Sequence, residues 1–158
     1  MRREKLYELL ETAERHQRAG RLRRAVAFYR KVLSVARDDE SEWELAHVRL
    51  GLLHMRQDQV SKAVPHLMRA HALAPHEDAY ALWLGQALNR VGQPFSAARV
   101  LIDICHSPVC GTSALIDLAR AAADLGERVQ AREILTCVAK QSRQPQAFPD
   151  ALTYCQDA

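Results

Sequence analysis

The sequence contains few aromatic residues, few glycines and prolines, and no long apolar run. Its 158 residues include 6 glycines, 6 prolines and 4 cysteines, and aromatic residues make up 6%. This composition excludes collagen-like, low-complexity and disulfide-scaffold proteins. No apolar run approaches the ~18–20 residues of a membrane-spanning helix, and the N-terminus alternates leucine with glutamate, unlike a signal peptide. We therefore expect a cytoplasmic globular protein with reduced cysteines.

The sequence also lacks the motifs that usually carry catalysis or cofactor binding. It contains no phosphate-binding loop, Gly-x-Ser-x-Gly elbow, His-Glu-x-x-His or dinucleotide fingerprint. The nearest approach to a metal site is Cys105, His106 and Cys110, but these cysteines are spaced more widely than in common zinc knuckles, and no second pair completes four ligands. We interpret the seven histidines as structural. The expectation is a non-enzymatic protein without a metal or other cofactor.

Charge is distributed unevenly along the chain. The net charge is +3, but residues up to Arg37 contain 11 Lys/Arg against 4 Glu, whereas the remainder contains 11 Lys/Arg against 15 Asp/Glu. Five carboxylates fall within residues 38–44. Such polarity can attract a charged partner or favour head-to-tail association of copies into a homo-oligomer. The alternative is two ordinary solvated faces.

A basic stripe is predicted on the second helix. Its members pair at a spacing of seven, which places each pair on one side of a helix: Arg23 with Arg30, and Arg24 with Lys31. The stripe could contact nucleic-acid phosphates or an anionic surface. However, RNA-binding motifs are missing and aromatics are scarce, so a solvated convex face is the preferred interpretation.

Several sets of residues recur with one period. Turn residues separated by 38, 34 and 34 are Gly20, Asp58, Gly92 and Gly126. Alanines five positions later are Ala25, Ala63, Ala97 and Ala131, and bulky residues four further on are Tyr29, Leu67, Leu101 and Leu135. Small residues upstream of each turn are Ala13, Gly51, Gly85 and Ala119. Independent sets that share one spacing indicate four stacked structural repeats.

Between these landmarks the apolar residues follow helical spacing, which predicts one helix on each side of every turn. Glycine in the turn position suits the left-handed residue that ends a helix, and Pro94 suits the first turn of the next helix. The small residues would let the two helices of a pair approach closely, and the bulky residues would fill the space between successive pairs. Stacked pairs would bury a core that no single pair could form.

Three local features modify this pattern. The four extra residues of the first repeat precede Ser41, which with Glu44 reads as a capping box and predicts a helix that begins one turn early. Pro65 is expected to bend its helix or to occupy the first turn. A short helix within residues 148–156 is expected to cap the apolar end of the stack.

The chain resembles the tetratricopeptide repeat (TPR) family. The resemblance rests on Leu84-Gly85 through Gly92, Ala97 and Leu101, and on Leu50-Gly51 through Asp58, Ala63, Leu67, Ala70 and Pro75, and it covers about residues 6–143. It implies an all-α, right-handed superhelix, a TPR solenoid of about four antiparallel helix pairs. The repeats would span about 6–39, 40–77, 78–111 and 112–145 in one domain over residues 1–158.

The resemblance also implies a function. The first helices of the pairs would line a concave groove that holds a peptide or helix of another protein, as in adaptors, scaffolds and chaperones. By their positions, the groove residues would be Tyr7, Leu10, Glu14, Leu45, Val48, Leu52, Met55, Arg56, Leu82, Gln86, Asn89, Arg90, Ile116 and Arg120. A short chain with an apolar groove also resembles type III secretion chaperones.

The predicted groove has an apolar floor and an arginine rim. TPR proteins that capture a chaperone's C-terminal carboxylate use a Lys and an Asn in the first repeat, and Leu10 and Glu14 replace them here. An amphipathic helix or apolar segment with flanking carboxylates would fit instead. The alternative is that the aliphatic residues of this floor simply pack between neighbouring helices.

Overall fold

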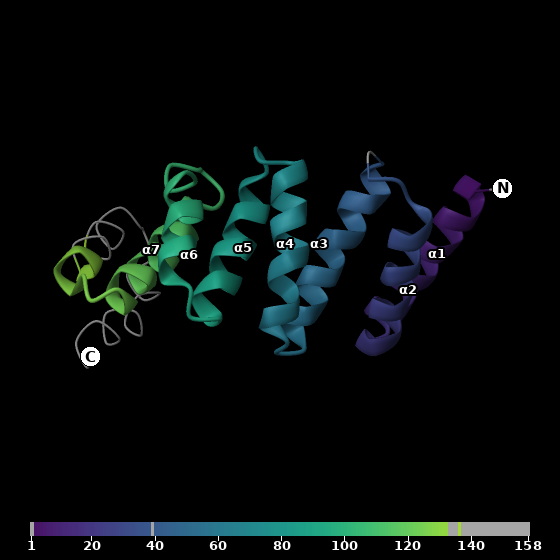
Figure 1. The fold of residues 1–158 in the computed structure, drawn as a ribbon, viewed down its shortest axis with the longest axis horizontal. Coiled ribbons are helices and arrows are strands. Elements are labelled where there is room, and N and C mark those ends of the chain that lie inside the picture. The colour runs from purple at the N-terminus through teal and green to yellow at the C-terminus, as the bar shows by residue number, and fades with distance from the viewer. Residues whose placement is uncertain (1, 39, 133–135, 137–158) are drawn as a thin grey trace. The chain divides into compact units, whose positions relative to one another are not determined.

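The computed structural model describes residues 2–38, 40–132 and 136, and these are entirely helical apart from turns and loops. The helices are α1 (Arg2–Arg18), α2 (Leu22–Val35), α3 (Ser41–Arg56), α4 (Val60–Leu73), α5 (Asp78–Arg90), α6 (Pro94–Ile102) and α7 (Gly111–Asp124) (Figure 1). Residues 128–132 are helical as well. The predicted all-α class with sequential antiparallel pairs is confirmed.

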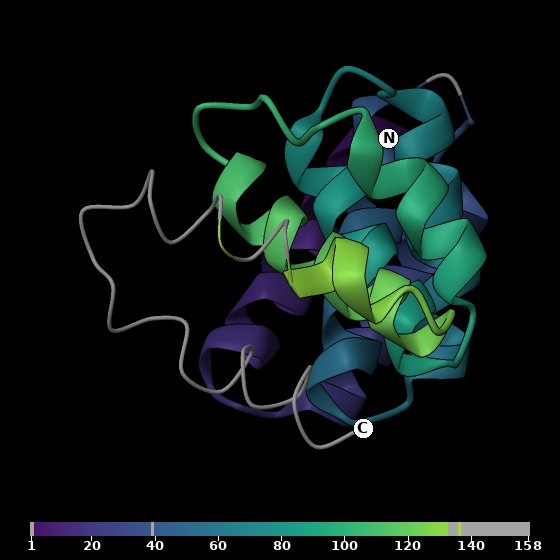
Figure 2. The same cartoon turned by 90° about the vertical axis from the view of Figure 1, so that its left-hand side faces the viewer.

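The chain forms two compact units, Met1–Ala74 and Pro75–Ala158. In the first unit α2 packs against both α1 and α3, and α4 packs against α3. In the second unit α5, α6 and α7 pack against one another. Figure 2 shows the chain after a turn of 90° about the vertical axis, with the helices of the second unit facing the viewer. Each helix therefore buries its apolar face mainly against its neighbours in sequence.

The turn residues adopt the backbone conformation that the repeat pattern predicts. Gly20, Gly92 and Gly126 have φ angles of +69°, +74° and +86°, and Asp58 has +58° at the equivalent position. Left-handed backbone costs little for glycine and more for other residues, because a Cβ then crowds the following carbonyl. The prediction that this residue ends the first helix of each pair is confirmed.

Close contact within each pair depends on the small residues before the turns. A Cβ atom added to Gly51 would lie 2.6 Å from Leu67 Cδ2, and one added to Gly85 would lie 2.5 Å from Leu101 Cδ2. Leu67 and Leu101 are fully buried. The small residues thus allow the predicted close approach. The ends of these two bulky leucines contact the first helix of their own pair, in addition to any role between pairs that the sequence predicts.

The core of the first unit extends through α1, α2 and α3. Its fully buried members include Leu6, Ala13, Ala25, Tyr29 and Leu50. The Tyr29 hydroxyl donates a hydrogen bond of 3.0 Å to Gln17 Oε1, which gives this buried polar group a partner. Burial raises the pKa of Tyr29. Each buried leucine of such a core contributes roughly 1.5–3 kcal/mol through loss of contact with water.

The structure corrects the predicted capping box at Ser41. α3 begins at Ser41 as expected, but there is no capping box: Glu40 is the N-cap, and the Ser41 hydroxyl donates to Glu42 Oε2 at 3.3 Å. The Glu40 carboxylate instead accepts a 2.8 Å hydrogen bond from the Arg37 backbone N–H and pairs with Arg2. The first of these bonds is the main reason why the pKa of Glu40 is lowered.

Pro65 lies within α4 and beyond its first turn, and the helix continues to Leu73. Pro94 occupies the first turn of α6, as predicted. The predicted capping helix at 148–156 and the bulky residue Leu135 lie outside the described residues. None of the helices in the described part of the chain has both the length and the apolar character that a membrane crossing requires.

Candidate functional site

The groove residues predicted in the first unit differ in their accessibility. Leu10 and Val48 are only 8% and 5% exposed, so these two aliphatic side chains pack in the interior of the unit. The half-buried members are Glu14, Leu45, Leu52 and Met55, and the exposed members are Tyr7 and Arg56. Among these accessible groove residues, the apolar side chains of Leu45, Leu52 and Met55 lie beside the charged Glu14 and Arg56.

The groove residues predicted in the second unit form a more polar surface on α5 and α7. Leu82, Gln86 and Ile116 are half-buried, and Asn89 is buried. Arg90 and Arg120 are exposed. The sequence predicted that these residues share a surface, but not how they are connected.

Asp117 connects the polar residues of α5 and α7. Its Oδ2 accepts a 2.9 Å hydrogen bond from Gln86 Nε2, and its Oδ1 forms a 2.9 Å ion pair with Arg120. Its backbone carbonyl accepts a 2.8 Å hydrogen bond from Asn89 Nδ2. Four side chains from two helices are thus held in one fixed arrangement. The Asn89 Oδ1 is buried and has no hydrogen-bond partner among the described residues.

Asp117 is nearly inaccessible, with 5% of the residue exposed. Burial raises its pKa, against the opposing effects of the Gln86 hydrogen bond and the Arg120 charge. Sequence reasoning missed this residue. The only available signal was an acidic residue directly after Ile116 in an otherwise apolar helical pattern, and such a residue is solvent-exposed in most helices.

Three histidines gather inside the first unit, between α3 and α4. His47 Nδ1 lies 2.9 Å from His66 Nδ1, and the His54 ring stacks on the His66 ring with centroids 5.8 Å apart. Burial is the main cause that lowers the pKa of His66, to about 4. Burial also lowers the pKa values of His47 and His54. These imidazoles are neutral packing groups at pH 7.

The predicted basic stripe divides into two sides of α2. All four members are exposed. Burial is the largest cause that lowers the pKa of His16 of α1, and the nearby Arg24 lowers it further. Burial likewise lowers the pKa of His54 of α3, and Arg30 adds to that effect. Lys31 Nζ lies 4.8 Å from the centroid of the Phe28 ring. The positive charge of α2 therefore does not form one continuous face.

The cysteine loop before α7 is held by its own hydrogen bonds. Cys105 Sγ donates to the Leu101 carbonyl at 3.3 Å, and Cys110 is buried. Burial raises the pKa of the Cys105 thiol, which keeps it protonated and weakly nucleophilic. Over the described ranges, no group of three or more His, Cys, Asp or Glu residues is positioned to hold a metal ion.

Solved structures of TPR proteins match this arrangement over most of the chain. YrrB, described as a TPR protein with an unusual peptide-binding site, matches with a TM-score of 0.76 and 20% identity over 93% of this chain and 72% of YrrB. The chain has the TPR fold. MamA matches with a TM-score of 0.75 and 17% identity, over 91% of this chain and 76% of MamA.

A putative kinesin light chain of Podosopora anserina with nearly identical TPR-like repeats matches with a TM-score of 0.72 and 23% identity, over 87% of this chain and 77% of the other. Neither a family model nor a curated protein matches the sequence. Proteins with the TPR fold are typically protein- or peptide-binding modules and are generally not catalytic. The TPR fold thus narrows the class of function without identifying a partner.

Proposed function

We propose that this chain is a non-enzymatic adaptor or chaperone that binds a segment of another protein on the accessible faces of its first helices. The observation that carries the proposal is the Asp117 network. Gln86 on α5 and Arg120 on α7 meet at one buried carboxylate, so the surface beside them is ordered before any partner arrives. Preorganised side chains lose less conformational entropy on binding, which favours their use as a recognition surface.

The two units favour a partner with mixed chemistry. The first unit offers half-buried Leu45, Leu52 and Met55, of which the flexible methionine adapts to varied apolar side chains. The second unit offers the exposed guanidinium groups of Arg90 and Arg120. Guanidinium groups pair well with carboxylates because their geometry allows two parallel hydrogen bonds. The expected partner is an amphipathic helix or extended segment that carries both apolar and acidic residues.

Affinity capture from native extract tests the proposal when it is made with matched variants. Leu52→Glu places a charge on the apolar surface of α3, and Arg90→Glu reverses a charge on α5. The control variants alter residues of the second helices. Arg99→Glu on α6 changes a residue that is exposed like Arg90, and Met68→Glu on α4 places the same charge on an apolar residue that is more exposed than Leu52. Circular dichroism establishes that all four variants keep their helical content.

The partner is a protein that mass spectrometry finds with the wild type and both controls but not with Leu52→Glu or Arg90→Glu. Calorimetric titration with the purified partner should then show at least tenfold weaker binding for each of those two variants. Equal capture by all the variants would place the binding surface elsewhere. Capture of secreted effector proteins alone would favour the secretion-chaperone alternative over a general adaptor.

A further inference from the structure

One end of the first unit carries a concentration of positive charge. The α1–α2 and α3–α4 turns lie at this end (Figure 1). The cations in and beside these turns, which we call the cationic end, are Arg15, Arg18, Arg21, Arg23, Arg24, Arg56 and Lys62. Carboxylates near the two turns are Glu14, which forms a 2.8 Å ion pair with Arg18, and Asp58. The cations outnumber the carboxylates at this end, so its net charge is strongly positive.

Folding brings several of these cations together around one imidazole. Burial is the largest cause that lowers the pKa of His16, and the charges of Arg24, Arg21 and Arg15 each lower it further. These residues come from the end of α1, the turn and the first turn of α2, so the hairpin itself gathers them. His16 is also stacked against Phe28, with ring centroids 5.3 Å apart, which fixes its position within the cluster.

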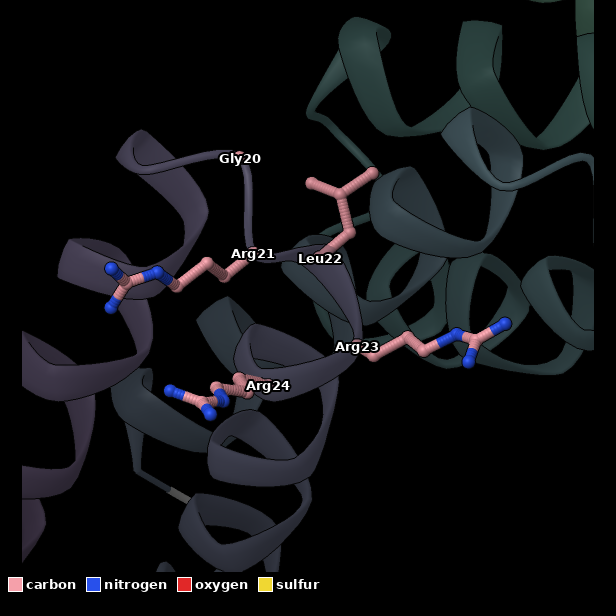
Figure 3. Close-up of a pocket in the computed structure, with 5 residues that line it drawn as sticks. All are labelled: Gly20, Arg21, Leu22, Arg23 and Arg24. Atoms are coloured by element: carbon pink, nitrogen blue, oxygen red, sulfur yellow. The ribbon is translucent and has the colours of Figure 1, made fainter.

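An open depression lies at the same place. It is lined by Gly20, Arg21, Leu22, Arg23 and Arg24 and has a volume of about 520 Å³ (Figure 3). Arg21 and Arg24 extend toward one side of it, while Arg23 extends in the opposite direction (Figure 3). Within the described part of the chain, Arg21, Arg23 and Arg24 form no ion pair with a carboxylate.

Like charges held close together raise the energy of the folded chain unless counter-charges offset them. The α1–α2 hairpin holds Arg21, Arg23 and Arg24 together, and in the described part of the chain no carboxylate pairs with them. We propose that the cationic end binds a carboxylate-rich segment of another polypeptide. The guanidinium groups of Arg21 and Arg24 would make paired hydrogen bonds to its carboxylates.

A polypeptide fits this surface better than a single-stranded nucleic acid. Nucleic-acid surfaces of this kind combine cations with exposed aromatic rings on which bases stack. Here the Phe28 ring is already in contact with His16 and Lys31, and Tyr29 is fully buried. Charge is therefore available at this end, but a stacking platform is not.

Arg56 of α3 belongs to both surfaces, but the inference is tested separately from the proposed function, because Arg21 and Arg24 lie in the α1–α2 turn and at the start of α2 and not on the first helices. Leu52→Glu and Arg90→Glu should leave binding at the cationic end within about twofold of wild type. A failure of either proposal therefore leaves the other standing.

The test measures binding of a fluorescein-labelled ten-residue glutamate peptide by anisotropy at low salt. Arg21→Glu/Arg24→Glu reverses two charges of the cationic end. The matched control, Arg99→Glu/Arg128→Glu, makes the same change in net charge on exposed residues of the second unit. A decamer of uridine serves as the nucleic-acid probe of similar charge. Circular dichroism establishes that both double variants fold.

The expected result is that Arg21→Glu/Arg24→Glu weakens peptide binding by about tenfold or more, while the control variant changes it by less than about threefold. Wild-type affinity should fall as salt increases, because the attraction is between exposed charges. Equal weakening by both double variants would mean that only net charge matters and would overturn the proposal. Tighter binding of the uridine decamer, lost in the same variant, would overturn it in favour of nucleic acid.

Discussion

The Nδ1 atoms of His47 and His66 lie 2.9 Å apart, across the contact between α3 and α4. At this distance one imidazole donates its Nδ1 proton and the other accepts it, so the pair is stable with one Nδ1 proton and not with two. The charged groups around the cluster are cationic: Arg30 of α2 and Lys62 and Arg69 of α4. The cations on α2 and α4 therefore oppose protonation of the histidine cluster.

The first prediction concerns the loss of folding stability at acidic pH. The pKa of His66 is near 6.5 when the chain is unfolded and is lowered to about 4 in the fold. Between these values the unfolded chain binds a proton that the folded chain excludes. The contribution of His66 to the free energy of unfolding is therefore complete above pH 6.5 and declines as the pH falls toward 4. Urea unfolding at pH 7, 6 and 5 should show this decline. His66→Gln should flatten it, whereas His76→Gln, at an exposed site, should not.

The second prediction concerns the close contact of α3 and α4. Gly51→Ala should lower the free energy of unfolding by about 1–2 kcal/mol, because overpacking against Leu67 exceeds the gain in helix propensity. Thermal unfolding measures the change. In the double variant Gly51→Ala/Leu67→Ala the loss should be smaller than the sum of the two single losses, since the shortened side chain relieves the contact. Strict additivity would show that this contact is not tight.

The third prediction concerns the turn residue of the second repeat. Asp58 has a φ of +58° where the other three turns have glycine. Asp58→Gly should therefore raise the free energy of unfolding by about 0.5–1 kcal/mol, since the strain of left-handed backbone disappears. The reciprocal change Gly92→Ala should cost about 1 kcal/mol. A higher melting temperature for Gly92→Ala would contradict this account of the turns.

The fourth prediction concerns Asp117. Burial raises its pKa in the fold, so the folded chain holds this proton more tightly than the unfolded chain, and the associated stability is lost as the pH rises through the folded pKa. Asp117→Asn does not titrate. The free energy of unfolding of the variant, minus that of the wild type, should therefore increase as the pH rises above the ordinary aspartate pKa of 3.8 and level off above the raised pKa of the folded chain. A difference independent of pH would show that the carboxylate is not desolvated.

The repeat pattern was enough to predict the helix pairs and their turns. A left-handed turn residue has few chemical solutions, so Gly20, Gly92 and Gly126 identify three turns by residue type alone. Local signals at helix starts were less reliable. Ser41 and Glu44 had the sequence of a capping box, but Glu40 occupies the N-cap and is engaged by Arg37 and by the distant Arg2.

The composition and period of this chain determined by themselves an all-α repeat fold, because the spacing of apolar and turn residues acts through local backbone preferences. Only the tertiary structure decided which residues meet: Asp117 with Gln86, and Arg24 with His16. Residues in these pairs belong to different helices, so no periodicity links them. Periodicity also could not distinguish Leu10, which is buried, from Leu52, which remains accessible, because both lie on apolar helical faces.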